Sequence, residues 1–263
     1  MTLVWRPGFA YDTDASNYID AVEAADQIAS PGIGALETAT RYAINDFVLG
    51  CKQDGIWSAI KASCILSGAR TLAGALVPLA GTAPTNVGPF VSGDYNRKTG
   101  LVGNGSSKYL NSNRAGNADP QNNHHASVYA TSANTGTKWY MGSETGATGS
   151  TNLYSASGTE VYGRSRHTAV ATPQRNNSTG LIAMTRASSA TWTLRSAGGN
   201  TTYSINSEVP ASANYGIFIA ISSTLNSHAD ARLAFYSIGE SLDLALLDNR
   251  VSTLIAQFGA VIP

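Results

Sequence analysis

The acidic residues of the second half of the chain are the first candidates for chemistry. Hydrolysis of a glycosidic bond requires two carboxyl groups on one face, a few ångströms apart. Between residues 95 and 230 the acidic residues are Asp119, Glu144, Glu160, Glu208 and Asp230, and no two of them lie within ten positions of each other. We therefore expect no enzymatic activity, with carboxylates brought together from distant loops as the remaining alternative.

The four histidines, His124, His125, His167 and His228, do not have the spacing of a metal site. Neighbouring residues of a strand point to opposite faces, so His124 and His125 cannot both face one ion there. The sequence also lacks the HExxH and CxxC patterns. We expect histidines on the surface or in loops, with no metal and no cofactor.

Composition argues against several classes of protein. The chain has 263 residues with 17 basic and 17 acidic side chains, and this balance does not fit a general nucleic-acid binder. Charged residues make up 13 % of the sequence, about half of the usual ~25 %.

No segment approaches the roughly 18 apolar residues of a membrane span, and residues 1–11 show no secretory signal. Cys51 and Cys64 are expected to be free, buried thiols.

The elements that would position these residues change in character along the chain. Apolar residues at helical spacing predict a helix beginning at Asp14 and ending at Ser30, a second from Ala35 to Leu49, and a third segment, Ile56–Ile65, with the same spacing. We expect residues 1–80 to form a helical N-terminal arm and residues 81–99, rich in Pro, Gly and Thr, to form a linker.

From about residue 100 the pattern changes to short strands separated by Asn- and Gly-rich turns. Ser241 is expected to cap a C-terminal helix. The predicted strands are Lys108–Asn111, Ala126–Thr131, Lys138–Met141, Glu160–Arg164, Gly180–Arg186, Thr191–Ser196, Tyr203–Ile205, Tyr215–Ser222 and Arg232–Ile238. The predicted fold is α+β and mainly β, in which an antiparallel jelly-roll sandwich with a C-terminal helix (residues 100–263) follows the arm.

Four segments of the second half resemble the laminin-G and concanavalin A-like jelly rolls. They are the Gly-rich turn and strand at Gly100–Leu110, the core strand Ala126–Thr131, the hairpin Gly180–Ser196, and the strand and helix at Arg232–Phe258. From the first segment to the last, the resemblance spans about 160 residues, and each motif alone is unspecific. Glucanases of this fold carry three alternating carboxylates on one strand, a pattern that this sequence lacks.

A second resemblance concerns the linker and its flanks. Asp54-Gly55-Ile56-Trp57, the TLAGALVPL run at Thr71–Leu79, Ala83–Asn86 and Phe90–Gly100 are similar to uncharacterised virion proteins of tailed phages, especially marine and cyanobacterial ones. The resemblance implies a structural or host-contacting protein in the virion, assembled in the host cytoplasm. It does not choose between head and tail.

Lectins of this fold hold sugars with loop Asn, Asp and Gly residues and an aromatic platform, sometimes with calcium. The candidate residues for glycan binding are Asp94, Tyr95 and Asn96, then Asn122 and Asn123, then Trp139 and Tyr140. Oxygen-rich loops suit calcium, and flat aromatic rings suit the apolar face of a pyranose. Asn-rich loops are also what turns require, so turn residues are the alternative.

Charge is distributed unevenly. Residues 1–50 carry seven carboxylates and two arginines, whereas Arg164, Arg166, Arg175, Arg186 and Arg195 make residues 151–200 basic. Scattered solvated charge accounts for this pattern, and head-to-tail assembly, with acidic helices meeting a basic sheet face, is the alternative. A homo-oligomer is expected, with a trimer as one form. The leading functional prediction is a non-catalytic virion structural protein, either a capsid decoration or a tail-fibre component. Its partners would be other virion proteins and further copies of the chain, with neither nucleic acid nor membrane. A host-glycan-binding lectin of the tail is the alternative, and a glycan hydrolase ranks last.

Overall fold

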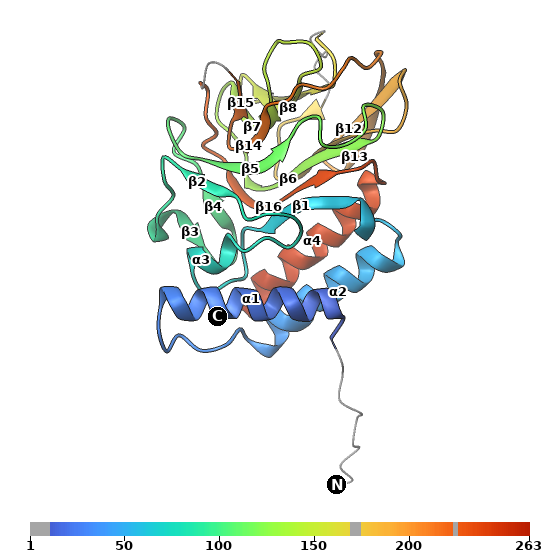
Figure 1. The fold of residues 1–263 in the computed structure, drawn as a ribbon. Helices are drawn as coiled ribbons and strands as arrows, with labels where there is room; N and C mark the ends of the chain where they lie inside the picture. Colours follow the sequence, from blue (N-terminus) through green and yellow to red (C-terminus); the bar gives the residue numbers. More distant parts are fainter. Residues whose placement is uncertain (1–10, 169–174, 223–225) are drawn as a thin grey trace.

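The computed structural model describes residues 11–168, 175–222 and 226–263, which form three layers (Figure 1). Helices cover one face of a central sheet, and an outer sheet covers its other face. The predicted fold class is confirmed, because most of the chain forms two antiparallel sheets stacked as a sandwich, with helices at the N-terminal side and one helix at the C-terminal end.

The central sheet has the strand order β13-β12-β11-β6-β16-β4-β3, with β1 also paired to β16. Its strands are β1 (Ile60–Ile65), β3 (Tyr95–Asn96), β4 (Gly100–Val102), β6 (His124–Ser132), β11 (Gly180–Arg186), β12 (Thr191–Ser196), β13 (Gly199–Ser204) and β16 (Arg232–Gly239). The long antiparallel ladder between β6 and β16 forms its middle.

The outer sheet has the order β10-β9-β8-β7-β14-β5-β2, with β15 paired in parallel to β7. Its strands are β2 (Thr85–Val87), β5 (Tyr109–Ala115), β7 (Lys138–Ser143), β8 (Thr151–Ala156), β9 (Glu160–Ser165), β10 (Arg175–Asn176), β14 (Asn214–Ile217) and β15 (Ala220–Ile221). Apolar side chains such as Leu153, Val161, Trp192 and Tyr236 fill the space between the two sheets.

The helical layer consists of α1 (Thr13–Ala29), α2 (Thr38–Gln53) and α4 (Leu244–Val261), and the short α3 (Leu72–Ala75) packs against α1. Asp12 caps α1 and Asp243 caps α4, in place of the predicted Asp14 and Ser241, because their carboxylates accept the first free backbone N–H groups. Two 3-10 turns, η1 (Trp57–Ala59) and η2 (Ser92–Asp94), complete the elements.

The helix predicted for residues 56–65 is wrong. Residues 60–65 form β1 and pair with β16, with Cys64 opposite Tyr236 and Ile65 opposite Phe235. Cys64 enters the core between the sheets, whereas Ile65 enters the core beneath the helices. A strand buried on both faces has apolar residues at nearly every position, so its sequence also fits a helix.

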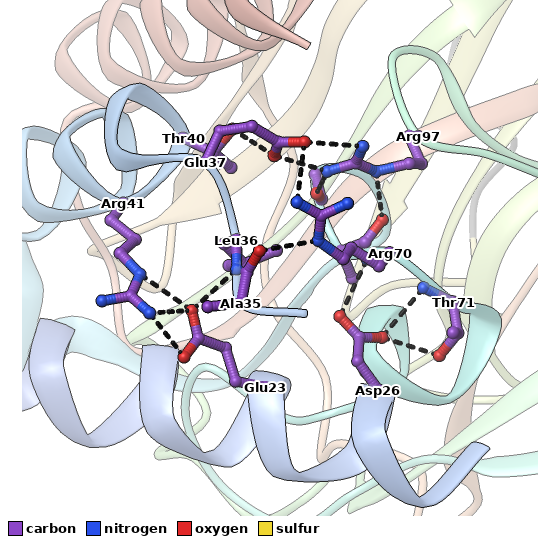
Figure 2. A network of polar contacts seen from close by, with 12 residues as sticks. Glu23, Asp26, Ala35, Leu36, Glu37, Thr40, Arg41, Arg70, Thr71 and Arg97 are labelled. Atoms are coloured by element: carbon purple, nitrogen blue, oxygen red, sulfur yellow. Dashed lines mark hydrogen bonds and ion pairs between the residues drawn. The ribbon is translucent and has the colours of Figure 1, made fainter. Parts of the chain in front are cut away.

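A network of polar contacts joins the helices to the loops of the central sheet (Figure 2). The buried carboxylate of Asp26 accepts hydrogen bonds from the backbone N–H groups of Arg70 and Thr71 and from the Thr71 hydroxyl, at 2.7–2.8 Å. The carboxylate of Glu37 binds the guanidinium groups of Arg97, at 2.7 Å, and Arg70, at 3.1 Å. The hydrogen bonds from Arg97 lower the pKa of Glu37 to about 2.

Both cysteines are free and buried, as predicted. Burial raises the pKa of each thiol to about 12, so both stay protonated at neutral pH. Within the described residues, no helix is sufficiently long and apolar to cross a membrane.

Candidate functional site

The face of the outer sheet that points away from the central sheet carries a line of aromatic side chains. In β9, Val161 and Ser165 are buried and Gly163 lies against Trp192 of the central sheet, so these three residues face the core. Because side chains alternate along a strand, Tyr162 and Arg164 must face the opposite way. The same alternation in β8 buries Leu153 and leaves Tyr154 half-buried on the outer face.

The line begins with three rings on three neighbouring strands. Tyr154 pairs in register with Trp139 of β7 on one side and with Tyr162 of β9 on the other. The ring centroids of Trp139 and Tyr154 are 4.4 Å apart, and those of Tyr154 and Tyr162 are 5.3 Å apart. Neighbouring strands lie about 4.8 Å apart, so the sheet itself sets this spacing.

Two more rings continue the line. The backbone of His228 bridges to that of Trp139, and the His228 ring lies 6.0 Å from the ring of Tyr109 in β5. His228 is buried, and burial lowers its pKa, so the ring is neutral at pH 7. We call Tyr109, Trp139, Tyr154 and Tyr162, together with His228, the aromatic row.

Polar groups lie along the aromatic row. The phenol of Tyr162 donates a hydrogen bond of 3.2 Å to the carboxylate of Glu160. Burial, and to a smaller extent the negative charge of Glu160, raise the pKa of Tyr162. Burial also raises the pKa of Tyr154, against the opposing effect of the Arg164 charge. The row thus presents apolar ring surface with neutral hydroxyl groups at its side, which is the character of a surface that binds sugars.

Of the predicted glycan-binding residues, Trp139 lies in the aromatic row and the others do not. Its neighbour Tyr140 points into the core, where it is fully buried, accepts a hydrogen bond from the backbone N–H of Asn134 and contacts Asn177. This is the alternation of a strand, so a pair of adjacent aromatic residues can supply only one ring to a surface.

Asp94 ends η2, and Tyr95 and Asn96 form β3, an edge strand of the central sheet, whereas Trp139 lies in the outer sheet. Asp94 accepts a hydrogen bond from the backbone of Val91 and forms an ion pair with Lys108. The Tyr95 phenol donates to the carbonyl of Ala69, and Asn96 accepts from the backbone N–H groups of the following turn. Their polar atoms therefore have intramolecular partners, which fits the alternative of turn residues.

Asn122 and Asn123 lie just before β6 in the central sheet. The side-chain oxygen of Asn122 accepts a hydrogen bond from the hydroxyl of Ser207. That of Asn123 accepts from the backbone N–H and the hydroxyl of Ser241, next to α4. Among the described residues, no hydrogen bond or ring contact joins these asparagines, the residues at β3 and Trp139 into one site.

Sequence reasoning missed Tyr109, Tyr154 and Tyr162 as site residues. The strand β8 was not predicted, and without it the partner between Trp139 and Tyr162 is absent. The alternation of Thr151, Leu153 and Ser155 with polar or aromatic residues is the signal that could have identified β8. Nothing in the sequence alone indicates that β7, β8 and β9 pair in this register.

The prediction of histidines on the surface or in loops is wrong for His124 and His125, which lie in β6, whereas His167 and His228 lie in loops. All four are buried, since the sheets and loops close over them. His124 contacts the Ser165 hydroxyl at 2.8 Å, whereas His125 contacts the Ser237 hydroxyl at 2.6 Å. Burial lowers the pKa of His124 well below its usual value and that of His125 to about 4, so both rings are neutral at pH 7.

The structure shows what the acidic residues of the sandwich do. Asp119 pairs with Arg114, Asp230 pairs with Lys138, and Glu208 accepts hydrogen bonds from Gly149 and Thr168. Within the described part of the chain, no three His, Cys, Asp or Glu side chains are grouped so that they could hold a metal ion.

The arginines of residues 151–200 do not form one basic face in the described part of the chain. Arg166 and Arg186 are fully buried, where their guanidinium groups donate to backbone carbonyls, and Arg195 forms an ion pair with Asp248 of α4. The side chain of Arg175 lies outside the described residues. Of the four described arginines, only Arg164 lies on the outer face of the outer sheet without an ion pair.

Two hollows lie in other parts of the molecule. One, of about 350 Å³, lies between α2 and α4, where Arg250 is paired with Asp54. The other, of about 360 Å³, lies beside Trp57, whose indole N–H donates to Asp14. In both, the named group at the wall already has an intramolecular partner, and neither hollow gathers several aromatic rings as the aromatic row does.

Comparison with known proteins places the fold. No model of a protein family matches the sequence, and no curated protein matches it. Among solved structures, a sialidase of Trypanosoma rangeli in complex with 2,3-difluoro-KDN is 10 % identical with a TM-score of 0.53, over 74 % of this chain and 33 % of the sialidase. The binding domain of botulinum neurotoxin serotype D is 12 % identical with a TM-score of 0.49, over 74 % of this chain and 51 % of that domain.

A third similar structure is the CBM40 of the Ruminococcus gnavus IT-sialidase bound to α2,3-sialyllactose. It is 12 % identical with a TM-score of 0.34, over 52 % of this chain and 82 % of that one. The chain thus spans about a third of the sialidase and half of the neurotoxin domain. At these identities the similarity shows the fold alone, a β-sandwich.

These comparisons correct the leading functional prediction. The similarity to the T. rangeli sialidase contradicts the assignment as a virion structural protein. The phage resemblance depended on short Gly-, Pro- and Asn-rich strings. In the structure the string at residues 71–79 contains the short helix α3, and that at residues 54–57 leads into η1. The strings at residues 83–86 and 90–100 contribute to the edge strands β2 and β3 and the turn at Asn96–Thr99.

Proposed function

We propose that this protein binds glycans through the aromatic row and does not hydrolyse them. The observation that carries the proposal is that three half-buried aromatic side chains, Trp139, Tyr154 and Tyr162, lie in register on the neighbouring strands β7, β8 and β9, on the outer face of the outer sheet. Large aromatic side chains gathered on one outer sheet face are a common feature of surfaces that bind ligands.

The geometry suits an extended sugar chain. The apolar faces of successive pyranose rings can pack along the row, and the phenol groups of Tyr154 and Tyr162 supply hydrogen bonds at the side of the row. The hydrolase alternative lacks support, because Asp119 and Asp230 are held in separate ion pairs and Glu160 is bonded to Tyr162.

The test is affinity electrophoresis of the full chain in native gels that contain single polysaccharides, neutral and acidic. Trp139→Ala and Tyr154→Ala should each weaken retention by about tenfold or more, since truncation of an aromatic anchor costs about 1–2 kcal/mol. Tyr42→Ala, which removes an exposed ring from α2, is the matched control and should bind as the wild type does.

Circular dichroism of each variant confirms that it is folded, and Trp139→Phe should restore part of the binding. Retention of the wild type by none of the polysaccharides, or full retention of Trp139→Ala, would contradict the proposal. Release of reducing sugar ends by the wild type would contradict the absence of hydrolysis.

A further inference from the structure

Arg164 lies beside the aromatic row and bears on the charge of the glycan that the row would bind. It is two residues after Tyr162 in β9, on the same outer face, and its register partner across β8 is Asn152. The charge of its guanidinium lowers the pKa of the Tyr154 phenol against the larger effect of burial. Because Tyr162 pairs with Tyr154 and Arg164 pairs with Asn152, Arg164 and Tyr154 are diagonal neighbours across β8 and β9, within reach of one ligand.

The guanidinium of Arg164 has no carboxylate partner among the described residues. By contrast, other cations of the sandwich are neutralised, with Lys108 bound to Asp94, Arg114 to Asp119 and Lys138 to Asp230. The nearest acidic residue along the same strand face, Glu160, is four residues away, about 13 Å along an extended strand, and is bonded to Tyr162. Arg164 thus leaves one positive charge uncompensated at the edge of the row.

Two buried polar atoms at the same place also lack partners. The Nε atom of Arg164 and the side-chain oxygen of Asn152 are both buried without a hydrogen bond. The Asn152 amide nitrogen donates to the carbonyl of Glu144, which fixes the direction of its oxygen. A buried polar atom without a partner costs about 1–3 kcal/mol, and these two atoms belong to one register pair of β8 and β9.

We propose that the aromatic row selects acidic glycans, and that Arg164 binds the carboxylate of a sugar whose ring packs against Tyr154. The planar guanidinium matches a carboxylate with two parallel hydrogen bonds, which favours a carboxylated sugar over a neutral one. Asn152, the register partner of Arg164 in β8, is fully buried beside it. This inference rests on the proposed function and adds the charge of its ligand.

The test uses polygalacturonate, alginate and polysialate, each compared with its carboxyl-reduced counterpart, in affinity electrophoresis with the full chain. At least one acidic polymer should bind the wild type about tenfold or more tightly than its reduced form. Arg164→Gln should remove this preference and leave binding to the reduced polymer unchanged. Arg164→Lys should keep only part of the preference, because an ammonium group lacks the planar fork.

Lys98→Gln is the matched control, because it removes one positive charge from the turn next to β3, in the other sheet. It should leave the preference as in the wild type. Equal binding of acidic and reduced polymers, or a preference that survives Arg164→Gln, would overturn this inference while the proposed function stands. Binding of none of the six polymers would overturn both.

Discussion

At the scale of single residues, buried charges in this molecule are held by the backbone. Arg186 is fully buried, and its guanidinium donates to the carbonyls of Ser165, Ser189 and Ile205, among others. Burial lowers its pKa to about 10. The residue thereby joins a strand of the outer sheet to loops that flank the central sheet.

We expect Arg186→Lys to lower the free energy of unfolding by about 3 kcal/mol or more, because an ammonium group cannot reach all of these carbonyls. Urea-induced unfolding followed by fluorescence measures the change. Arg41→Lys is the control, since its ion pair with Glu23 is half-exposed and should contribute less than about 1 kcal/mol. Equal effects of the two substitutions would contradict the role assigned to Arg186.

The buried histidines predict a loss of stability in acid. His125 has a pKa of about 4 in the folded chain because of burial, whereas an unfolded histidine has a pKa near 6.5. Between these values the unfolded state binds more protons, so the free energy of unfolding falls as the pH falls from about 6.5 to about 4. Glu37, with a pKa of about 2, adds a further loss below about pH 4.5.

Urea unfolding of the wild type and of His125→Gln at pH 7.5 and pH 4.5 checks this prediction. The difference between the two pH values should be smaller in the variant, by on the order of 2–3 kcal/mol. Because the comparison is between pH values, a general destabilisation by the substitution does not affect it. An unchanged difference would show that His125 is not the source of the acid sensitivity.

At the scale of elements, the residue that caps α4 lies two positions from the predicted one. The carboxylate of Asp243 accepts hydrogen bonds from the backbone N–H groups of Ala245 and Leu246, at 2.7 and 3.2 Å. Ser241, two residues earlier, instead bonds to Asn123. Both residue types can cap a helix, and the contact with Asn123 determines which of them does.

We expect Asp243→Ala to lower the free energy of unfolding by about 1 kcal/mol, and Asp243→Asn to keep most of the stability, because an amide oxygen can also accept these hydrogen bonds. Thermal unfolding of the three proteins is the measurement. If Asp243→Asn were as unstable as Asp243→Ala, the side chain would not act as a cap.

At the scale of the whole molecule, residues 11–80 are packed against the sandwich through two cores. Ile65, Phe235 and Leu181 lie under the helices with residues such as Phe47 and Phe258, and β1 is part of the central sheet. The division into an arm, a linker and a sandwich stays a prediction, as does the homo-oligomer, but these contacts bear on how a fragment would behave.

We expect a fragment of residues 91–263 to be unfolded or aggregated, because removal of α1, α2 and β1 uncovers the apolar face of the central sheet and the edge of β16. Circular dichroism and analytical ultracentrifugation of the fragment and the full chain give the comparison. A soluble, cooperatively unfolding fragment would instead support a sandwich that is independent of the helices.

The sequence by itself determined the fold class and several strands. The change from helical spacing to alternation predicts helices before a sandwich, and β11 and β12 have the bounds that were predicted for them. The absence of neighbouring carboxylates and the free thiols also follow from residue types and spacing. These features are local, so a single sequence carries them.

Only the tertiary structure decided where the candidate site lies. Trp139 could be identified as an aromatic residue on a strand, but Tyr154 and Tyr162 join it only because three strands pair in one register. The same holds for β1, whose apolar residues fit a helix until β16 pairs with them. Strand pairing joins residues that are far apart in the chain, and its energy depends on both partners, so no single segment encodes it.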